Sequence, residues 1–194
     1  NVNVATITQG MNMIQSEFDK AFSDVGVTLT GVSRPWGSWF VAGLYNLTET
    51  PQKAVLDFAK AGLPAGRYAV YDFWNRKYLG VKKRRVVFEL LPGDCVVLRL
   101  TPVENEMTLV SCTKHILQGA DELSDIRRNK NSLAGKLRTV AGQEAELGFF
   151  IPEGLAVNPG KNIFVRKNFA VLKIEPEQSG MTDWKINFIQ NKTN

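Results

Sequence analysis

The sequence has few of the residues that enzymes use for metal or nucleophilic chemistry. It holds one histidine and two cysteines in 194 residues. That scarcity excludes a multi-histidine metal site, a Cys₄ zinc site and a disulfide scaffold. No glycine-rich segment follows a strand and opens a helix with a lysine, so a phosphate-binding loop is excluded too. No run approaches the roughly 18 apolar residues that a membrane span needs. We therefore expect no metal, no cofactor and no membrane contact.

The composition is that of an ordinary globular protein. Hydrophobic residues make up 44% and charged residues 22% of the chain, which is long enough to bury a core without disulfides. The net charge is +5, and the densest basic run is 82–85, Lys-Lys-Arg-Arg. This run is either a polyanion-binding patch or a solvated turn before a strand. The excess is mild for a protein that binds nucleic acid, and we expect no such partner.

The two cysteines, Cys95 and Cys112, both lie in apolar, strand-like contexts. Free cysteine is among the most buried residue types, so we predict two free, buried thiols. One disulfide between them is the alternative.

The first 33 residues differ from the rest in their periodicity. Apolar residues recur there at spacings of three and four, which predicts an amphipathic helix that ends near Gly26. The stripe consists of Met11, Ile14, Phe18, Phe22 and Val25. We therefore expect an N-terminal helical segment over 1–33.

From about residue 37 the hydrophobic period changes to two, which is typical of strands. Many short strands joined by turns predict a mostly β protein built from antiparallel β-sandwiches of Greek-key or Ig-like type. The stretch 118–131 is polar and is predicted to be a long loop. We expect one sandwich over 34–105 and a second over 106–194. Whether the two sandwiches share one core or form two separate cores is not decided by the sequence. The predicted strands are 38–46, 53–59, 67–74, 78–81, 86–90, 96–100, 107–116, 133–140, 145–151, 163–165, 169–174 and 184–188.

No catalytic constellation can be read from the sequence. A triad or a thiol–imidazole pair must use His115, the only histidine. On an extended strand His115 and Cys112 point to opposite faces, which argues against a local pair. No spacing of carboxylates singles out an acid–base pair. We predict no catalytic residue.

Aromatic residues are the more informative class, because their faces stack on the apolar faces of sugars or on bases. Several of them gather within 36–78, and Asp72 and Trp74 are predicted to share one face of a strand. The candidate carbohydrate-binding residues are Trp36, Trp39, Asp72, Trp74 and Tyr78. The alternative is that these rings pack in the core and that Asp72 bonds to the turn at Asn75.

The order and spacing of several motifs carry a resemblance to a known family. They include Trp-Phe-Val-Ala-Gly-Leu-Tyr-Asn at 39–46 and Leu-Asp-Phe-Ala-Lys-Ala-Gly-Leu at 56–63. Tyr-Ala-Val-Tyr-Asp-Phe-Trp follows at 68–74, Tyr-Leu-Gly at 78–80 and Leu-Pro-Gly-Asp-Cys at 91–95. Residues 35–103 thus resemble the β-sandwich that follows the catalytic barrel in α-galactosidase-like (melibiase-like) glycoside hydrolases. Segments 109–118 and 133–142 are similar to a further C-terminal β region of the same bacterial proteins.

The resemblance implies a role without catalysis. In that family a pair of aspartates on the barrel strands performs a retaining double displacement, and no part of this chain matches the barrel. The implied role is a non-catalytic accessory region that packs against an upstream catalytic barrel and contacts carbohydrate. The resemblance also favours a periplasmic or secreted location. The alternatives are an independent carbohydrate-binding module and a basic polyanion-binding domain that uses 82–85, Lys114 and 127–128.

Overall fold

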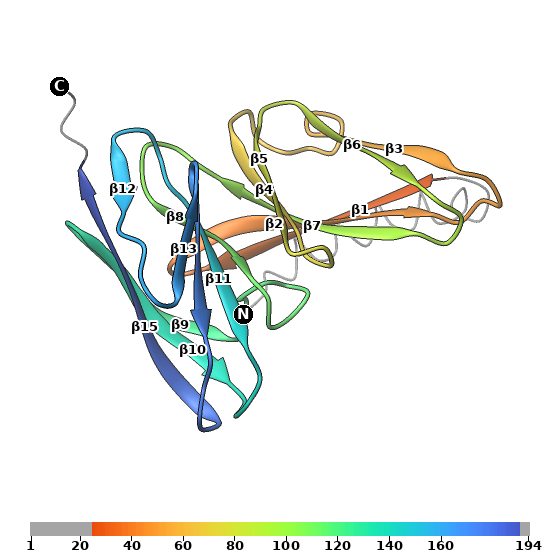
Figure 1. The fold of residues 1–194 in the computed structure, drawn as a ribbon. Helices are drawn as coiled ribbons and strands as arrows, with labels where there is room; N and C mark the ends of the chain where they lie inside the picture. The colour runs from red at the N-terminus through yellow and green to blue at the C-terminus, as the bar shows by residue number, and fades with distance from the viewer. Residues whose placement is uncertain (1–24, 191–194) are drawn as a thin grey trace. The chain divides into compact units, whose positions relative to one another are not determined.

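The computed structural model describes residues 25–190, and it consists of antiparallel strands joined by turns (Figure 1). This confirms the mostly β, antiparallel fold, and no helix occurs in this range. Accordingly, the described range contains no helix that meets the length and hydropathy needed to cross a bilayer. The chain divides into two compact units, the first ending at Pro102 and the second beginning at Val103.

The first unit is a sandwich of a five-stranded and a two-stranded sheet. The larger sheet has the order β1-β2-β7-β4-β5, and β3 and β6 form the smaller one. The strands are β1 (Val25–Arg34), β2 (Gly37–Asn46), β3 (Gln52–Asp57), β4 (Tyr68–Asp72), β5 (Lys77–Lys82), β6 (Arg85–Leu90) and β7 (Cys95–Pro102).

The core of the first unit lies between these two sheets. Alternate residues of each strand point into it, as the period of two predicts. The Tyr68 ring meets the Phe58 ring edge to face at 5.4 Å, and the Tyr68 hydroxyl donates to the Pro64 carbonyl at 2.7 Å. The core also contains Ala42, Leu44, Ala54, Leu56, Leu63, Val70, Val86, Leu90, Val96, Leu98 and Leu100.

The second unit contains two four-stranded sheets, β12-β15-β10-β9 and β13-β14-β11-β8. Leu147 and Ile186 are among its fully buried side chains, and the rings of Phe149 and Trp184 meet at 5.7 Å. The strands are β8 (Thr108–Cys112), β9 (Leu123–Asn129), β10 (Ser132–Thr139), β11 (Ala145–Phe150), β12 (Leu155–Val157), β13 (Ile163–Arg166), β14 (Phe169–Ile174) and β15 (Gly180–Gln190).

The N-terminal segment departs from the sequence prediction where it is described. The helix expected over 11–25 lies outside the described residues except for Val25, which begins β1. Gly26 does not end a helix but sits inside β1, opposite Tyr45 of β2. A Cβ added to Gly26 would lie 2.0 Å from Cζ of Tyr45, so the tyrosine ring covers a position that only glycine leaves open.

The predicted loop over 118–131 is wrong, because its second half is β9. This strand pairs with β10, and the register shifts between Ala134 and Lys136. Asp125, in the irregular part of β9, adopts a φ of 52°. An edge strand with polar, exposed residues and a bulge has no hydrophobic alternation, which is why its sequence looks like a loop.

The cysteine prediction is half right. Both thiols are free, as expected, and Cys112 is buried. Cys95 is exposed at the start of β7, and its expected burial is therefore wrong.

Candidate functional site

The turn between β4 and β5 presents the most exposed aromatic side chain of the predicted site. Trp74 lies in this turn and is 60% exposed. Its ring meets the edge of Phe73, with centroids 4.9 Å apart and planes 68° apart. An exposed indole held by a neighbouring ring is a rigid apolar platform, the kind of surface on which a sugar ring stacks.

The carboxylate of Asp72 holds this turn in shape. It accepts hydrogen bonds from the backbone N–H of Asn75 at 3.1 Å and from Nδ2 of Asn75 at 2.8 Å. Arg76, the next turn residue, adopts a left-handed φ of 47°. A side chain that closes its own turn in this way reduces the number of conformations that Trp74 can explore.

The expectation that Asp72 and Trp74 share an exposed face is wrong. β4 ends at Asp72, which is only 2% exposed, and Trp74 belongs to the turn rather than to the strand. The bond between Asp72 and the Asn75 turn is the arrangement considered as the alternative. Asp72 therefore positions the platform instead of facing solvent beside it.

Trp36 and Trp39 stack on one another away from this turn. Their centroids are 4.9 Å apart with planes at 27°, and Cζ of Arg99 lies 4.1 Å from the centroid of the Trp39 ring on β2. Trp39 is 1% exposed and Trp36 half-buried. Arg99, itself fully buried, donates from Nε to Oγ1 of Thr101 at 2.9 Å. This stack is occupied by the protein's own side chains, so Trp39 offers no free face to a ligand.

Tyr78 lies on β5 opposite Tyr71 of β4, and it is half-buried. The structure thus brings Asp72, Trp74 and Tyr78 to one hairpin and leaves Trp36 and Trp39 at the start of β2.

His115 lies in an exposed turn after β8. Its Nδ1 accepts a hydrogen bond from the backbone N–H of Leu117 at 3.2 Å, and Oε1 of Glu122 is 4.0 Å away. Cys112, which was considered as the thiol partner of His115, is fully buried. Residues 25–190 contain no group of three or more potential metal ligands from histidine, cysteine, aspartate and glutamate.

A hollow in the second unit was not anticipated from the sequence. It measures about 480 Å³ and lies on the sheet formed by β9, β10 and β15. Trp184 lines it, and its indole Nε1 is buried without a hydrogen-bond partner among the described residues. The register of β9 and β10 shifts beside this hollow, between Ala134 and Lys136. The one sequence signal is Gly135 of β10, where an added Cβ would meet the Trp184 ring at 2.9 Å. The remaining lining residues are Asp125, Arg127, Ala134, Lys136, Asp183 and Lys185.

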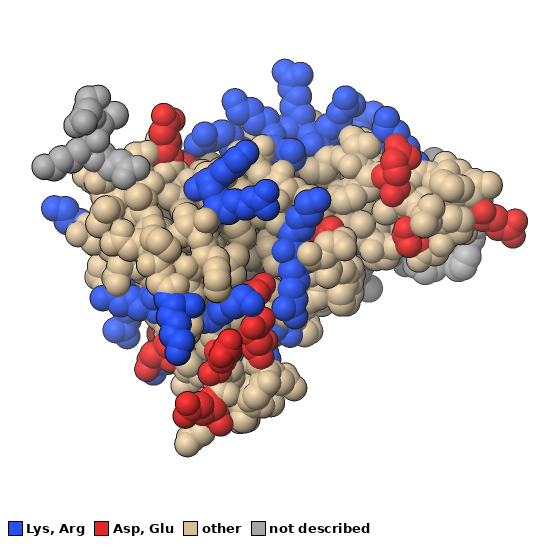
Figure 2. Space-filling model, viewed as in Figure 1, with Lys and Arg blue, Asp and Glu red and all other residues tan. Residues whose placement is uncertain are grey.

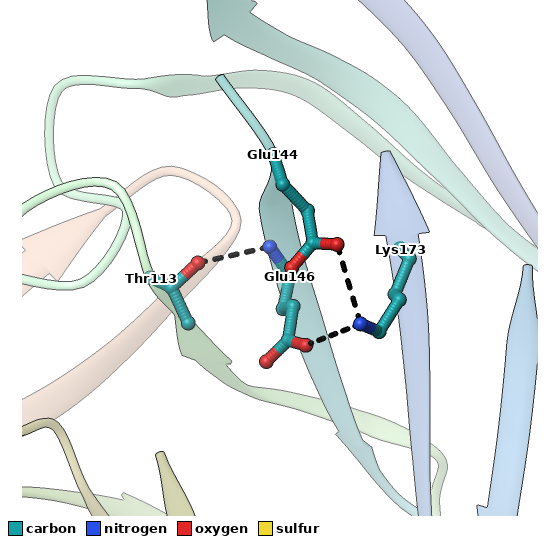
Figure 3. Close-up of polar contacts among 4 residues, drawn as sticks. All are labelled: Thr113, Glu144, Glu146 and Lys173. Atoms are coloured by element: carbon teal, nitrogen blue, oxygen red, sulfur yellow. Dashed lines mark hydrogen bonds and ion pairs between the residues drawn. The ribbon is translucent and has the colours of Figure 1, made fainter. Parts of the chain in front are cut away.

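A polar cluster joins β11 and β14 and the residues Thr113 and Glu144 just outside β8 and β11 (Figure 3). Nζ of Lys173 lies 3.2 Å from Oε2 of Glu144 and 3.4 Å from Oε1 of Glu146. The backbone N–H of Glu146 donates to Oγ1 of Thr113 at 2.9 Å. The hydrogen bond to Glu144 and the charges of both carboxylates raise the pKa of Lys173. The lysine is already paired, so the cluster is a structural brace.

Comparison with known proteins finds a family match within the first unit. Residues 33–100 match the family model of the alpha galactosidase C-terminal beta sandwich domain. This confirms the resemblance carried by the motifs between Trp39 and Cys95. The match covers about a third of the chain, and the resemblance of 109–118 and 133–142 stays a prediction.

Two solved structures are among those to which the chain is similar. The arabinose complex of a GH27 β-L-arabinopyranosidase from Geobacillus stearothermophilus is 19% identical, with a TM-score of 0.35 over 40% of this chain and 18% of that chain. The wild-type form of a GH27 β-L-arabinopyranosidase from the same organism is 18% identical, with a TM-score of 0.37 over 43% and 19%. The chain thus spans less than a fifth of the solved proteins that it matches. No curated protein matches it.

Proposed function

We propose that the chain is a non-catalytic accessory region of a glycoside hydrolase, which packs against a catalytic barrel and contacts carbohydrate through Trp74. The match of residues 33–100 to the alpha galactosidase C-terminal beta sandwich is the observation that carries this proposal. The resemblance of segments 109–118 and 133–142 extends the same hypothesis to the second unit.

The carbohydrate contact rests on the exposure of Trp74. An indole that is 60% exposed forgoes most of the hydrophobic stabilisation that burial of a tryptophan provides. The hydrogen bonds that Asn75 donates to the Asp72 carboxylate keep Trp74 in that position at low conformational cost to a ligand. A rigid, exposed aromatic ring is suited to stacking on the apolar face of a pyranose.

The non-catalytic role is supported by the chemistry of the described residues. His115, the only histidine of the chain, hydrogen-bonds its own turn through Nδ1. Asp72, a candidate carboxylate, is buried and engaged with Asn75. Neither side chain is arranged as a general acid or base toward an open cavity.

The test is equilibrium binding of the isolated chain to α- and β-galactosides, arabinosides and neutral plant polysaccharides, measured by calorimetry. We expect saturable binding to at least one glycan, weakened about tenfold or more in Trp74→Ala, which corresponds to about 1.4 kcal/mol of lost stacking. Leu91→Ala is the matched control, because Leu91 is an equally exposed apolar residue of the same unit, and it should leave the affinity unchanged.

Absence of binding at millimolar sugar would contradict the carbohydrate contact, and equal loss in both variants would contradict the platform at Trp74. The independent binding module is distinguished from the accessory role by affinity. A module holds polysaccharide on its own at micromolar concentration, whereas an accessory region binds tightly only beside a barrel.

A further inference from the structure

The turn that joins β5 to β6 concentrates positive charge. It consists of Lys82, Lys83, Arg84 and Arg85, and we call it the basic turn. The last three are exposed, and Lys82 is half-buried. Within 25–190 none of the four is in an ion pair. Figure 2 shows Lys and Arg side chains gathered along the edge where Figure 1 has β5 and β6.

Strand pairing adds further cations to the same end of the first unit. Lys82 pairs with Tyr68, which brings Arg67 beside the basic turn. The backbone N–H of Phe58 donates to the carbonyl of Arg84 at 2.8 Å, and the exposed Lys60 follows two residues later.

One carboxylate that the strand pairing brings to this end is Asp57, opposite Arg85. Its Oδ1 accepts the backbone N–H of Lys60 at 3.1 Å. Asp57 is thus already engaged in a turn, and it is one carboxylate beside the four cations of the basic turn. The resulting repulsion is relieved when a polyanion binds and replaces the loosely held counterions.

A hollow of about 240 Å³ opens beside the basic turn. Lys82 and Arg85 supply its cations, and the other lining residues are Leu79, Val86, Val87 and Phe88. Apolar walls next to two cations fit a ligand that has an apolar ring face and an anionic substituent. A bare inorganic anion would not need the apolar walls.

We propose that the basic turn binds an acidic polysaccharide, whose carboxylate or sulfate groups pair with Lys83, Arg84 and Arg85 while one sugar ring enters the hollow. This rests on the proposed carbohydrate contact and names the class of glycan. Single-stranded nucleic acid is less well matched, because it requires exposed aromatic faces for base stacking, and the aromatic residue of this hollow, Phe88, is half-buried.

The basic turn and the Trp74 platform can be tested separately. They lie at opposite ends of β5, which is six residues long. At about 3.3 Å per residue, that separation is close to 17–20 Å. A variant at one end therefore leaves the other end intact.

The experiment measures binding of the full chain to immobilised dextran sulfate, neutral dextran, polygalacturonate and a single-stranded DNA oligonucleotide, each from 50 to 500 mM salt. The test variant is Lys83→Glu/Arg84→Glu. The matched control is Lys130→Glu/Lys161→Glu, which reverses two exposed lysines of the second unit. Both change the net charge from +5 by −4, to +1. A further variant, Lys83→Gln/Arg84→Gln, replaces the two cations by neutral amides and therefore controls for an effect of the new carboxylates.

We expect dextran sulfate and polygalacturonate to bind in a salt-sensitive manner and neutral dextran not to bind at this surface. Affinity for dextran sulfate should fall about tenfold or more in the test variant, less in the neutral variant, and under about threefold in the control. Trp74→Ala should retain the affinity for dextran sulfate, so that failure of the Trp74 platform and failure of the basic turn give different results. Equal losses in test and control, or tighter binding to DNA than to either acidic glycan at the same salt, would overturn the proposal.

Discussion

Asn46 is the residue whose replacement should damage the first unit most clearly. Its side chain is fully buried at the end of β2 and uses both of its polar atoms. Nδ2 donates to the carbonyls of Thr50 at 2.9 Å and Leu90 at 3.0 Å. Oδ1 accepts from the backbone N–H of Thr48 at 3.0 Å and from its hydroxyl at 2.7 Å. The amide thereby joins the β2–β3 connection to the end of β6.

The cost of Asn46→Ala follows from those bonds. A hydrogen bond contributes about 1 kcal/mol net, but a buried group left without a partner costs about 1–3 kcal/mol. Thr50 is exposed, so water can replace its lost partner, whereas Leu90 is 2% exposed and its carbonyl loses the amide donor in a buried setting. Together these terms give a loss of about 2–4 kcal/mol in the free energy of unfolding.

Asn46→Asp separates the donor from the acceptor contribution. It keeps the oxygen that faces Thr48 and sets a carboxylate against the carbonyls of Thr50 and Leu90. We expect it to destabilise the unit at neutral pH at least as much as the alanine variant.

The assay is urea unfolding followed by tryptophan fluorescence and by near-UV circular dichroism, with Leu47→Ala as the control. Leu47 is the next residue along the chain and is 50% exposed, so its truncation should change stability by less than about 0.5 kcal/mol. If Asn46→Ala unfolds at the same urea concentration as Leu47→Ala, the reasoning about this buried amide is wrong.

Three further changes test other parts of the structure. Gly26→Ala should destabilise the first unit by about 1–3 kcal/mol, because the new methyl meets the Tyr45 ring; thermal unfolding measures this, and an unchanged melting temperature would mean that the ring moves freely away. Asp72→Ala should cost about 1–2 kcal/mol and broaden the conformations of the β4–β5 turn, which hydrogen exchange at the Asn75 amide reports; protection equal to wild type would argue against the bond from that amide. The pKa of Lys173 is raised, first by its hydrogen bond to Glu144, so the pairing stabilises the protein below the ordinary lysine pKa and is lost as the pH rises through the folded value. Titration of the Lys173 Nζ by NMR should therefore give a midpoint above that of the exposed lysines, and Glu144→Gln should lower it.

The strands with regular alternation could be predicted from the sequence. Ala145, Leu147 and Phe149 alternate with Glu146 and Gly148 in β11, and all three side chains are fully buried. Val96, Leu98 and Leu100 likewise face the core from β7. Both strands are buried on nearly all positions, but polar residues such as Glu146, Arg99 and Thr101 mark the second face, so the alternation states both the element and its orientation.

Elements without that contrast could not be predicted. β1 carries glycine and threonine among its apolar residues, and β12 has only three residues. β9 is a polar edge strand whose pairing with β10 comes from the register of the hairpin rather than from its own residues. Pairing across a sheet supplies the hydrogen bonds in all three, and a linear sequence does not display it.

The candidate site illustrates the same limit. The sequence identified Trp39 and Trp74 as equivalent aromatic candidates, but tertiary packing buries Trp39 beneath Arg99 and leaves Trp74 in a turn. The basic turn connects two strands, which agrees with the interpretation of 82–85 as a turn before a strand. Its surroundings come from strand pairing, which places Asp57 opposite Arg85 and Tyr68 opposite Lys82 and is not displayed by a linear sequence.

The carbohydrate contact at Trp74 is tested most directly by NMR of the four tryptophan indole groups. Each N–H signal is assigned from a Trp→Phe variant, and the chain is titrated with the glycan that binds best in calorimetry. The account predicts that the signal of Trp74 shifts saturably while those of Trp36, Trp39 and Trp184 move little. A saturable shift confined to Trp184, or none at Trp74, would contradict it.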